Sequence, residues 1–404
     1  MTRRQLMRMA MIAFPLAMPS GSTAAGSPQE LAPDAEDGPP LVTPVVQAVP
    51  FPPRWFDGTD GLIHLSYELL LANAVQLSVT VASLEVLNER GDRIAEMSGD
   101  RLKAAMSTLA APFVATAELP PSAVGVLWID LAVADRSALP DAVEHTLAVT
   151  VPPLPPQLPM PTTFTYTGAR APVTPRAATM IGPPLRSGRW VAIVGAHRRG
   201  LLPVSGGLHN GQRFAIDFSA RLDEAGRTHL GDADQNTSYF NYGEPLVAVA
   251  SGTIVEAVDR YPDQVPNHNV PVGLDAADGN HVIIALDEGI FAGYAHLKPN
   301  SLRVRRGQRV RRGQVLGLLG NSGNSTGPHL HFQLMNGPSL LVADGLPFTI
   351  EKFQLDGRVP SLELFLEADR NGTPVPIDHS DAGERRRRGL TGLEVLTFWT
   401  SAAS

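Results

Sequence analysis

Two histidines stand one residue apart in the stretch HLHFQL, directly after the glycine-rich segment GNSGNSTGP. Side chains two residues apart in a β-strand point to the same face of the sheet. A strand here therefore presents His329, His331 and Gln333 on one face, while the leucines and the phenylalanine take the other. Because the apolar face should cover a core, we expect the histidine face to open on a groove, where both imidazoles address one small site.

Two further stretches offer polar side chains in the same way. In RFAIDFS the aromatic and aliphatic side chains form one face, and Asp217 stands opposite. His209 lies just upstream, in a glycine-rich loop that can bend back toward Asp217. In GYAHL, His296 shares a face with Tyr294. Three separate predicted strands thus each provide a residue that is able to bind a metal ion.

The composition restricts what such a site can hold. Cysteine is absent, so a metal must be bound by His, Asp or Glu. A catalytic zinc takes three protein ligands and keeps one position for water. Additional imidazoles beside it transfer protons or stabilise an oxyanion. Strand geometry does not decide which residues ligate, but five candidates together fill all of these roles: His209, Asp217, His296, His329 and His331.

The order of these motifs along the chain resembles a known enzyme family. His209 followed by AIDF, then GNHVIIAL, GYAHL and GNSGNSTGPHLHFQL, is similar to the lysostaphin/LytM-type zinc metallopeptidases. The resemblance covers roughly residues 190–348, under half of the chain. Its most specific part is the HLHF block with the NSTGP segment before it. The family consists of cell-wall endopeptidases with a compact antiparallel β fold, the duplicated hybrid motif.

The resemblance assigns roles to the five residues. It implies that His209, Asp217 and His331 bind one Zn²⁺, and that His296 and His329 are the catalytic histidines beside the water. One spacing departs from the family: seven residues separate His209 from Asp217, whereas many relatives have about three. The loop must therefore bulge to close the site. The implied activity is hydrolysis of peptide bonds in peptidoglycan, in its cross-links or its stem peptides.

Other functions are compatible with parts of the sequence. The same fold includes non-catalytic regulators of other cell-wall hydrolases, which have lost zinc ligands, and the presence of all five residues argues against this alternative. A wall-binding protein that acts through its N-terminal domain is a third class. The loop NSGNSTG lacks the Gly-Lys-Ser/Thr ending of a phosphate-binding loop, and the chain has no HExxH zinc helix.

The elements that must position these residues are strands, and the sequence predicts an all-β protein. Short alternating segments such as QLSVTVASLEVL and HTLAVTV predict an immunoglobulin-like β-sandwich. His64 and His145 are expected at solvent-facing positions of its strands. A run of four arginines near the C-terminus is expected in a solvated tail. The predicted organisation is a β-sandwich over 45–151, a proline-rich linker over 152–185, the peptidase domain over 186–350 and a C-terminal extension over 351–404.

The N-terminus predicts export. A basic start, a short apolar core and small residues predict a signal over residues 1–25, followed by a disordered leader over 26–44. The apolar core is too short to span a membrane, and the pattern suits a secretory or a twin-arginine signal. We expect a monomeric protein in the periplasm or outside the cell, with peptidoglycan peptides as its partner. A net charge of -7 gives no reason to expect nucleic-acid binding.

Overall fold

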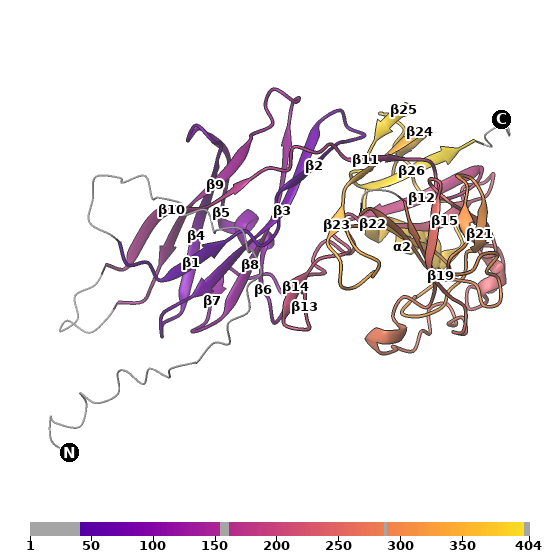
Figure 1. Cartoon of the computed structure of the whole chain (residues 1–404), viewed down its shortest axis with the longest axis horizontal. Coiled ribbons are helices and arrows are strands. Elements are labelled where there is room, and N and C mark those ends of the chain that lie inside the picture. Colours follow the sequence, from indigo (N-terminus) through magenta and orange to yellow (C-terminus); the bar gives the residue numbers. More distant parts are fainter. Residues whose placement is uncertain (1–40, 154–160, 287–288, 400–404) are drawn as a thin grey trace, which may run out of the picture. The chain divides into compact units, whose positions relative to one another are not determined.

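The computed structural model describes residues 41–153, 161–286 and 289–399. The predicted export signal lies outside these ranges, as does the predicted leader apart from residues 41–44. The described part of the chain is almost entirely β-structure (Figure 1), which confirms the all-β prediction. From Thr43 onward the chain forms one compact unit. No helix in the described ranges is long and apolar enough to cross a membrane.

The first part of this unit contains two antiparallel sheets, each with five strands in the described residues. One sheet has the order β1-β3-β8-β6, with β2 paired to β3: β1 (Val45–Ala48), β2 (Arg54–Asp57), β3 (Ile63–Asn73), β6 (Met106–Thr108) and β8 (Val124–Val133). The other has the order β10-β9-β4-β5, with β7 paired to β4: β4 (Val79–Leu87), β5 (Arg93–Ser98), β7 (Glu118–Leu119), β9 (Ala142–Thr150) and β10 (Thr163–Pro172). The helix α1 (Gly99–Ala104) follows β5.

Alternation along the strands builds the core between these two sheets. In β4, Val79 and Val81 are buried and the threonine between them is exposed. These valines share one core with Leu65 and Leu69 of β3, which makes the two sheets a β-sandwich. Its immunoglobulin-like classification stays a prediction.

The expectation of a solvent-facing His145 was wrong. Its place in β9 has the same parity as the buried Val143 and Leu147, so its side chain points into the core. The Tyr67 hydroxyl and the Ala169 carbonyl oxygen lie 2.9 and 3.1 Å from its two ring nitrogens. Burial lowers the pKa of His145 to about 4, so this histidine is a neutral, hydrogen-bonded core residue.

The second part is built around a sheet that has twelve strands among the described residues. Its order is β11-β24-β26-β12-β15-β22-β19-β18-β17-β20, with β23 on β22 and β25 on β24. The strands are β11 (Thr179–Ile181), β12 (Gly188–Val194), β15 (Ile216–Leu222), β17 (Gly252–Val258), β18 (Asn280–Ala285), β19 (Phe291–Leu297), β20 (Arg309–Val310), β22 (Leu330–Met335), β23 (Gly345–Leu346), β24 (Phe348–Arg358), β25 (Gly383–Arg388) and β26 (Leu393–Phe398).

Smaller elements surround this sheet. There are two small two-stranded sheets. One pairs β13 (Leu202–Val204) with β14 (Gly207–His209), and the other pairs β16 (Pro245–Val247) with β21 (Val315–Leu318). The helical elements are the 3₁₀ turns η1 (Asn236–Ser238) and η2 (Leu274–Ala276) and the helix α2 (Leu362–Asn371).

The predicted segment boundaries do not coincide with the strands. β10 lies within the predicted linker but pairs with β9 along its whole length, so it belongs to the sandwich. β24 runs across the predicted boundary at residue 350, and β26 pairs with β12. The four arginines at 385–388 lie in β25, which pairs with β24, and the expectation of a solvated tail there was wrong. The C-terminal segment is therefore part of the same sheet as the site residues.

Three neighbouring strands, β15, β22 and β19, carry or adjoin four of the five predicted site residues, and His209 lies on β14. β12, β15, β22 and β19 are consecutive in the sheet, and their labels lie together in Figure 1. Phe218 and Phe332, which alternate with Asp217 and His331, are fully buried in the main core of this part. Tyr294 packs on Phe332 in the same core, so the expectation that it shares a face with His296 was wrong, because the backbone turns at His296. The apolar face of these strands thus holds the sheet in place, and the opposite face is left for chemistry.

Candidate metal centre

Strand register brings Asp217 and His331 together. Asp217 of β15 is directly opposite His331 of β22 in the antiparallel ladder. The His331 Nδ1 lies 3.0 Å from Asp217 Oδ1. Side chains directly opposite each other on one face of a sheet are in contact, so the pair follows from the alternation of both strands.

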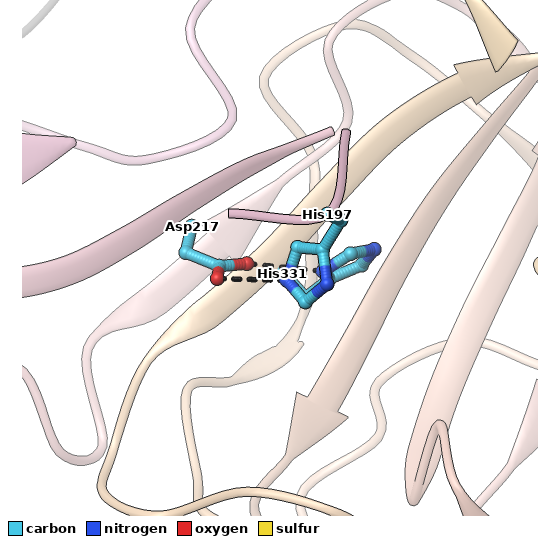
Figure 2. Close-up of side chains that lie close together, drawn as sticks. All are labelled: His197, Asp217 and His331. Atoms are coloured by element: carbon cyan, nitrogen blue, oxygen red, sulfur yellow. Dashed lines mark hydrogen bonds and ion pairs between the residues drawn. The ribbon is translucent and has the colours of Figure 1, made fainter. Parts of the chain in front are cut away.

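A third residue completes this cluster, and it is His197. Its Nε2 lies 2.9 Å from Asp217 Oδ2, and its ring packs edge-on against the His331 ring at 4.7 Å between centroids. One ligand atom from each of His197, Asp217 and His331 lies within 4.8 Å of the others. Figure 2 shows the two imidazoles facing the two oxygens of the carboxylate.

His197 was not among the site residues predicted from the sequence, because its position depends on how β12 pairs with β15. β12 pairs with β15 so that Ile193 is opposite Asp217. The segment GAHRRG leaves the end of this strand and forms a turn in which the Arg198 amide donates to the Gly195 carbonyl at 3.1 Å. A histidine a few residues beyond the register partner of Asp217 is thereby returned to the carboxylate.

His209 does not join the cluster. It is the last residue of β14, opposite Leu202 of β13, and its ring folds back toward Gly207 of the same hairpin. The expected bulge that would return His209 to Asp217 is therefore not formed. The place four positions before Asp217, which leaves the three intervening residues that many relatives have, is occupied here by Arg213. Arginine has no acceptor atom and stays protonated in proteins, so it cannot bind a metal.

Gln333 fixes the orientation and the tautomer of His331. The Gln333 amide nitrogen donates to the Leu340 carbonyl oxygen at 3.2 Å, so its own oxygen is available as an acceptor. That oxygen lies 2.9 Å from His331 Nε2. Gln333 therefore keeps a proton of His331 on Nε2, and Nδ1, which faces Asp217, is the nitrogen that would bind a metal once it gives up the proton it shares with the carboxylate. An outer partner of this kind is common for metal-binding histidines.

His296 and His329 lie beside the cluster and leave their Nε2 atoms open. The Nδ1–H of His296 donates to the Ser322 carbonyl oxygen at 2.8 Å, and that of His329 donates to the Gly327 carbonyl oxygen at 2.9 Å. The two rings are 4.7 Å apart between centroids, and His296 is 6.0 Å from His331. Their shared hydrogen-bonding pattern places an unprotonated nitrogen of each ring on the side of the site.

The backbone at His296 is unusual. Its φ of 63° lies in the left-handed region, which costs roughly 1–2 kcal/mol for a residue with a Cβ. The amide of His296 donates to the Asp278 carbonyl oxygen at 3.0 Å. This turn at the end of β19 directs the imidazole toward His329, and strained conformations of this kind often occur at functional sites.

Burial and charge shift the pKa values in opposite directions. Burial favours the neutral form of Asp217, but the hydrogen bonds from His197 and His331 outweigh it and hold this pKa well below its usual range. Burial lowers the pKa of His296 strongly and that of His329 as well. The site thus combines one ionised carboxylate with two histidines that are neutral at pH 7, which is the charge state that general-base chemistry needs.

The three clustered residues fit a zinc ion. Two imidazole nitrogens and one carboxylate oxygen are ordinary zinc ligands, and three of them leave one coordination position for water. The exposed fraction of the side chain is 33% for His197 and 13% for Asp217, so the cluster can be reached from solvent. His331, at 3%, closes its inner side.

Residues 237–341 match the profile of peptidase family M23. These residues include both His296 and the His329–His331 pair, whose geometry is described above. This part of the chain is an M23 peptidase domain. The match begins after Asp217, so His197 and Asp217 lie outside it. The resemblance to lysostaphin/LytM-type peptidases is thereby confirmed.

Named relatives of the M23 domain are bacterial endopeptidases. The chain is 28% identical over 134 residues to the glycyl-glycine endopeptidase ALE-1 of Staphylococcus capitis, covering 33% of this chain and 27% of that protein. It is 46% identical over 57 residues to the peptidoglycan DD-endopeptidase ShyA of Vibrio cholerae, covering 14% and 13%. It is 34% identical over 122 residues to the DD-carboxypeptidase/endopeptidase Mpg of Neisseria meningitidis, covering 27% and 26%. The aligned part is thus less than a third of each relative.

Proposed function

We propose that this protein is a zinc-dependent endopeptidase that hydrolyses peptide bonds in peptidoglycan. The observation that carries the proposal is the grouping of His197, Asp217 and His331, with the open nitrogens of His296 and His329 beside it. The presence of an M23 domain supports the same reaction class. In this proposal His197 takes the ligand role that the family resemblance had implied for His209.

The two flanking histidines supply the proton transfers. When bound, Zn²⁺ would supply Lewis-acid activation of a water and of the scissile carbonyl. His296 and His329 are neutral at pH 7 and present Nε2, so either one accepts a proton there as the water attacks. The resulting imidazolium donates to the leaving amine or to the oxyanion. Asp217 stays ionised throughout and would bind the Zn²⁺ together with His197 and His331.

The names of the relatives support the proposed substrate class. Two of the three are called peptidoglycan or DD-specific peptidases, and the third is a glycyl-glycine endopeptidase. All three names describe cleavage of a peptide bond, and the name of ShyA places that bond in peptidoglycan. We extend this substrate class to the present chain and, with it, an exported location in the periplasm or outside the cell.

Digestion of purified cell walls tests the proposal. The wild-type protein with zinc should release peptide products that mass spectrometry identifies, and a chelator or His331→Ala should abolish this release. A wild-type protein that releases nothing, yet activates a separate wall hydrolase, would instead be a regulator.

A matched pair of variants tests the ligand assignment. His197→Ala should remove zinc, measured as bound metal per chain after dialysis. His209→Ala changes the same residue type twelve positions away and should leave zinc bound. The opposite result would return the ligand role to His209.

A further inference from the structure

A buried carboxylate of the sandwich contacts the segment that carries His197. Glu68 lies on β3 and has no exposed surface. Arg213 forms a bidentate ion pair with Glu68, with Nε 3.0 Å from Oε1 and Nη2 2.7 Å from Oε2. Arg198 also donates to Oε1, and the Asn210 amide donates to the same oxygen at 2.9 Å. One carboxylate therefore accepts hydrogen bonds from three residues of the segment 198–213.

Arg198 is the residue that directly follows His197. Besides Glu68, its guanidinium donates to the Tyr67 carbonyl at 2.8 Å and to the Ile129 carbonyl at 3.2 Å. It also pairs with Asp130 at 3.1 Å. Every one of these partners lies on β3 or β8. The backbone at position 198, and with it the start of the His197 side chain, is thus fixed against the sandwich.

Arg213 holds the other end of the same segment. It lies four positions before Asp217, its side chain is 1% exposed, and it also donates to Asp344 at 2.6 Å. Between the two arginines, Leu201 and Leu208 pack with Val126 and Trp128 of β8. Both ends of the segment 198–213 and its apolar middle therefore contact the sandwich.

The geometry points to Glu68 as a positioning residue for the metal centre, an inference that rests on the proposed zinc site. Apart from the turn hydrogen bonds at residues 195–200, the segment 195–213 contains only the short β13–β14 pair as regular structure, so few hydrogen bonds of its own fix the position of His197. Without a second anchor, ordering it on metal binding would cost conformational entropy. By drawing Arg198 and Arg213 to one point, Glu68 places His197 next to Asp217 before metal arrives.

The test compares Glu68→Gln with the matched variant Glu96→Gln, whose side chain on the same sandwich is 51% exposed. Zinc affinity of the full chain is measured by competition with a chromophoric chelator, and Co²⁺ absorption reports the ligand geometry. Glu68 acts through Arg198 and Arg213, so Glu68→Gln should bind zinc more weakly by a factor of up to about 10–100, the range for loss of a direct partner of a metal ligand. Glu96→Gln should bind zinc as the wild type does.

A double-mutant cycle separates positioning from a general loss of structure. If Glu68 acts through Arg198 beside His197, the loss of zinc affinity caused by Glu68→Gln should be much smaller in an Arg198→Met background. An equal loss in both backgrounds, or wild-type affinity in Glu68→Gln, overturns the inference. Should Glu68→Gln fail to fold, Arg198→Met alone is compared with the wild type, because it leaves the pair between Arg213 and Glu68 intact, and wild-type zinc affinity in Arg198→Met then overturns the inference. A wild-type chain that binds no zinc would refute the proposed function instead.

Discussion

Glu68 should make the protein markedly less stable in acid. Burial alone would raise the pKa of this carboxyl, but the charges of Arg213 and Arg198 outweigh it and lower the pKa from 4.5 to about 2. The other charged groups packed against these arginines are Asp130 and Asp344. The perturbation is a fall in pH from 6 to 3, applied to the metal-free protein so that zinc release does not contribute.

The sign and the size of this change in stability with pH follow from proton linkage. Because the folded pKa is lower than the unfolded one, the unfolded chain binds the proton more readily between them, and stability falls as pH falls. The contribution is fully present above about pH 4.5 and disappears toward pH 2. A shift of this size corresponds to about 3 kcal/mol at neutral pH, of which about 2 kcal/mol should be gone by pH 3.

Urea unfolding followed by tryptophan fluorescence measures this contribution. Other carboxylates also titrate in this range, so the quantity to compare is the stability difference between wild type and Glu68→Gln at each pH. That difference should shrink by about 2 kcal/mol from pH 6 to pH 3. For Glu96→Gln, an exposed partner of Arg93, it should change by less than about 0.5 kcal/mol. A difference for Glu68→Gln that stays constant with pH would refute the view that this ion cluster lowers the pKa.

The remaining predictions concern the metal centre and the core. His331→Ala should abolish zinc binding, whereas His329→Ala should keep zinc bound and stop turnover; equal loss of metal in both would contradict their separate roles. Gln333→Ala removes the acceptor of the His331 ring proton and should weaken zinc binding about 10–100-fold, which isothermal titration would detect. Phe353→Ala removes a fully buried ring of β24 and should lower the free energy of unfolding by about 3–5 kcal/mol, with thermal unfolding as the check and an unchanged melting temperature as the contrary result.

Local alternation was enough to predict most of the site. The pattern of HLHFQL places His331 and Gln333 on the face opposite the buried Phe332, and the structure has them there. RFAIDFS likewise presents Asp217 opposite Phe218. These placements depend only on the two-residue period of a strand and on which face is apolar. Both can be read from neighbouring residues.

Contacts between distant segments could not be read in this way. His197 reaches Asp217 because β12 pairs with β15 in one particular register, and nothing local to GAHRRG specifies that pairing. The same limit applies to the C-terminal segment, since β26 joins the sheet beside β12 from about 200 residues away in sequence. The family resemblance favoured His209 despite its longer spacing from Asp217, and only the tertiary structure shows that its ring stays with its own hairpin.

Arg213 connects the unusual ligand choice to the rest of the molecule. An arginine four positions before Asp217 cannot bind a metal, so the third ligand has to come from elsewhere. The buried charge of this arginine also needs a carboxylate partner. Glu68 of the sandwich meets that need and also binds Arg198 beside His197. A fragment that starts at residue 186 would lose Glu68, and one that ends at residue 350 would lose the β26 partner of β12. Inactivity of such a fragment would therefore not argue against a peptidase, because the sandwich and the C-terminal strands support the proposed zinc ligands.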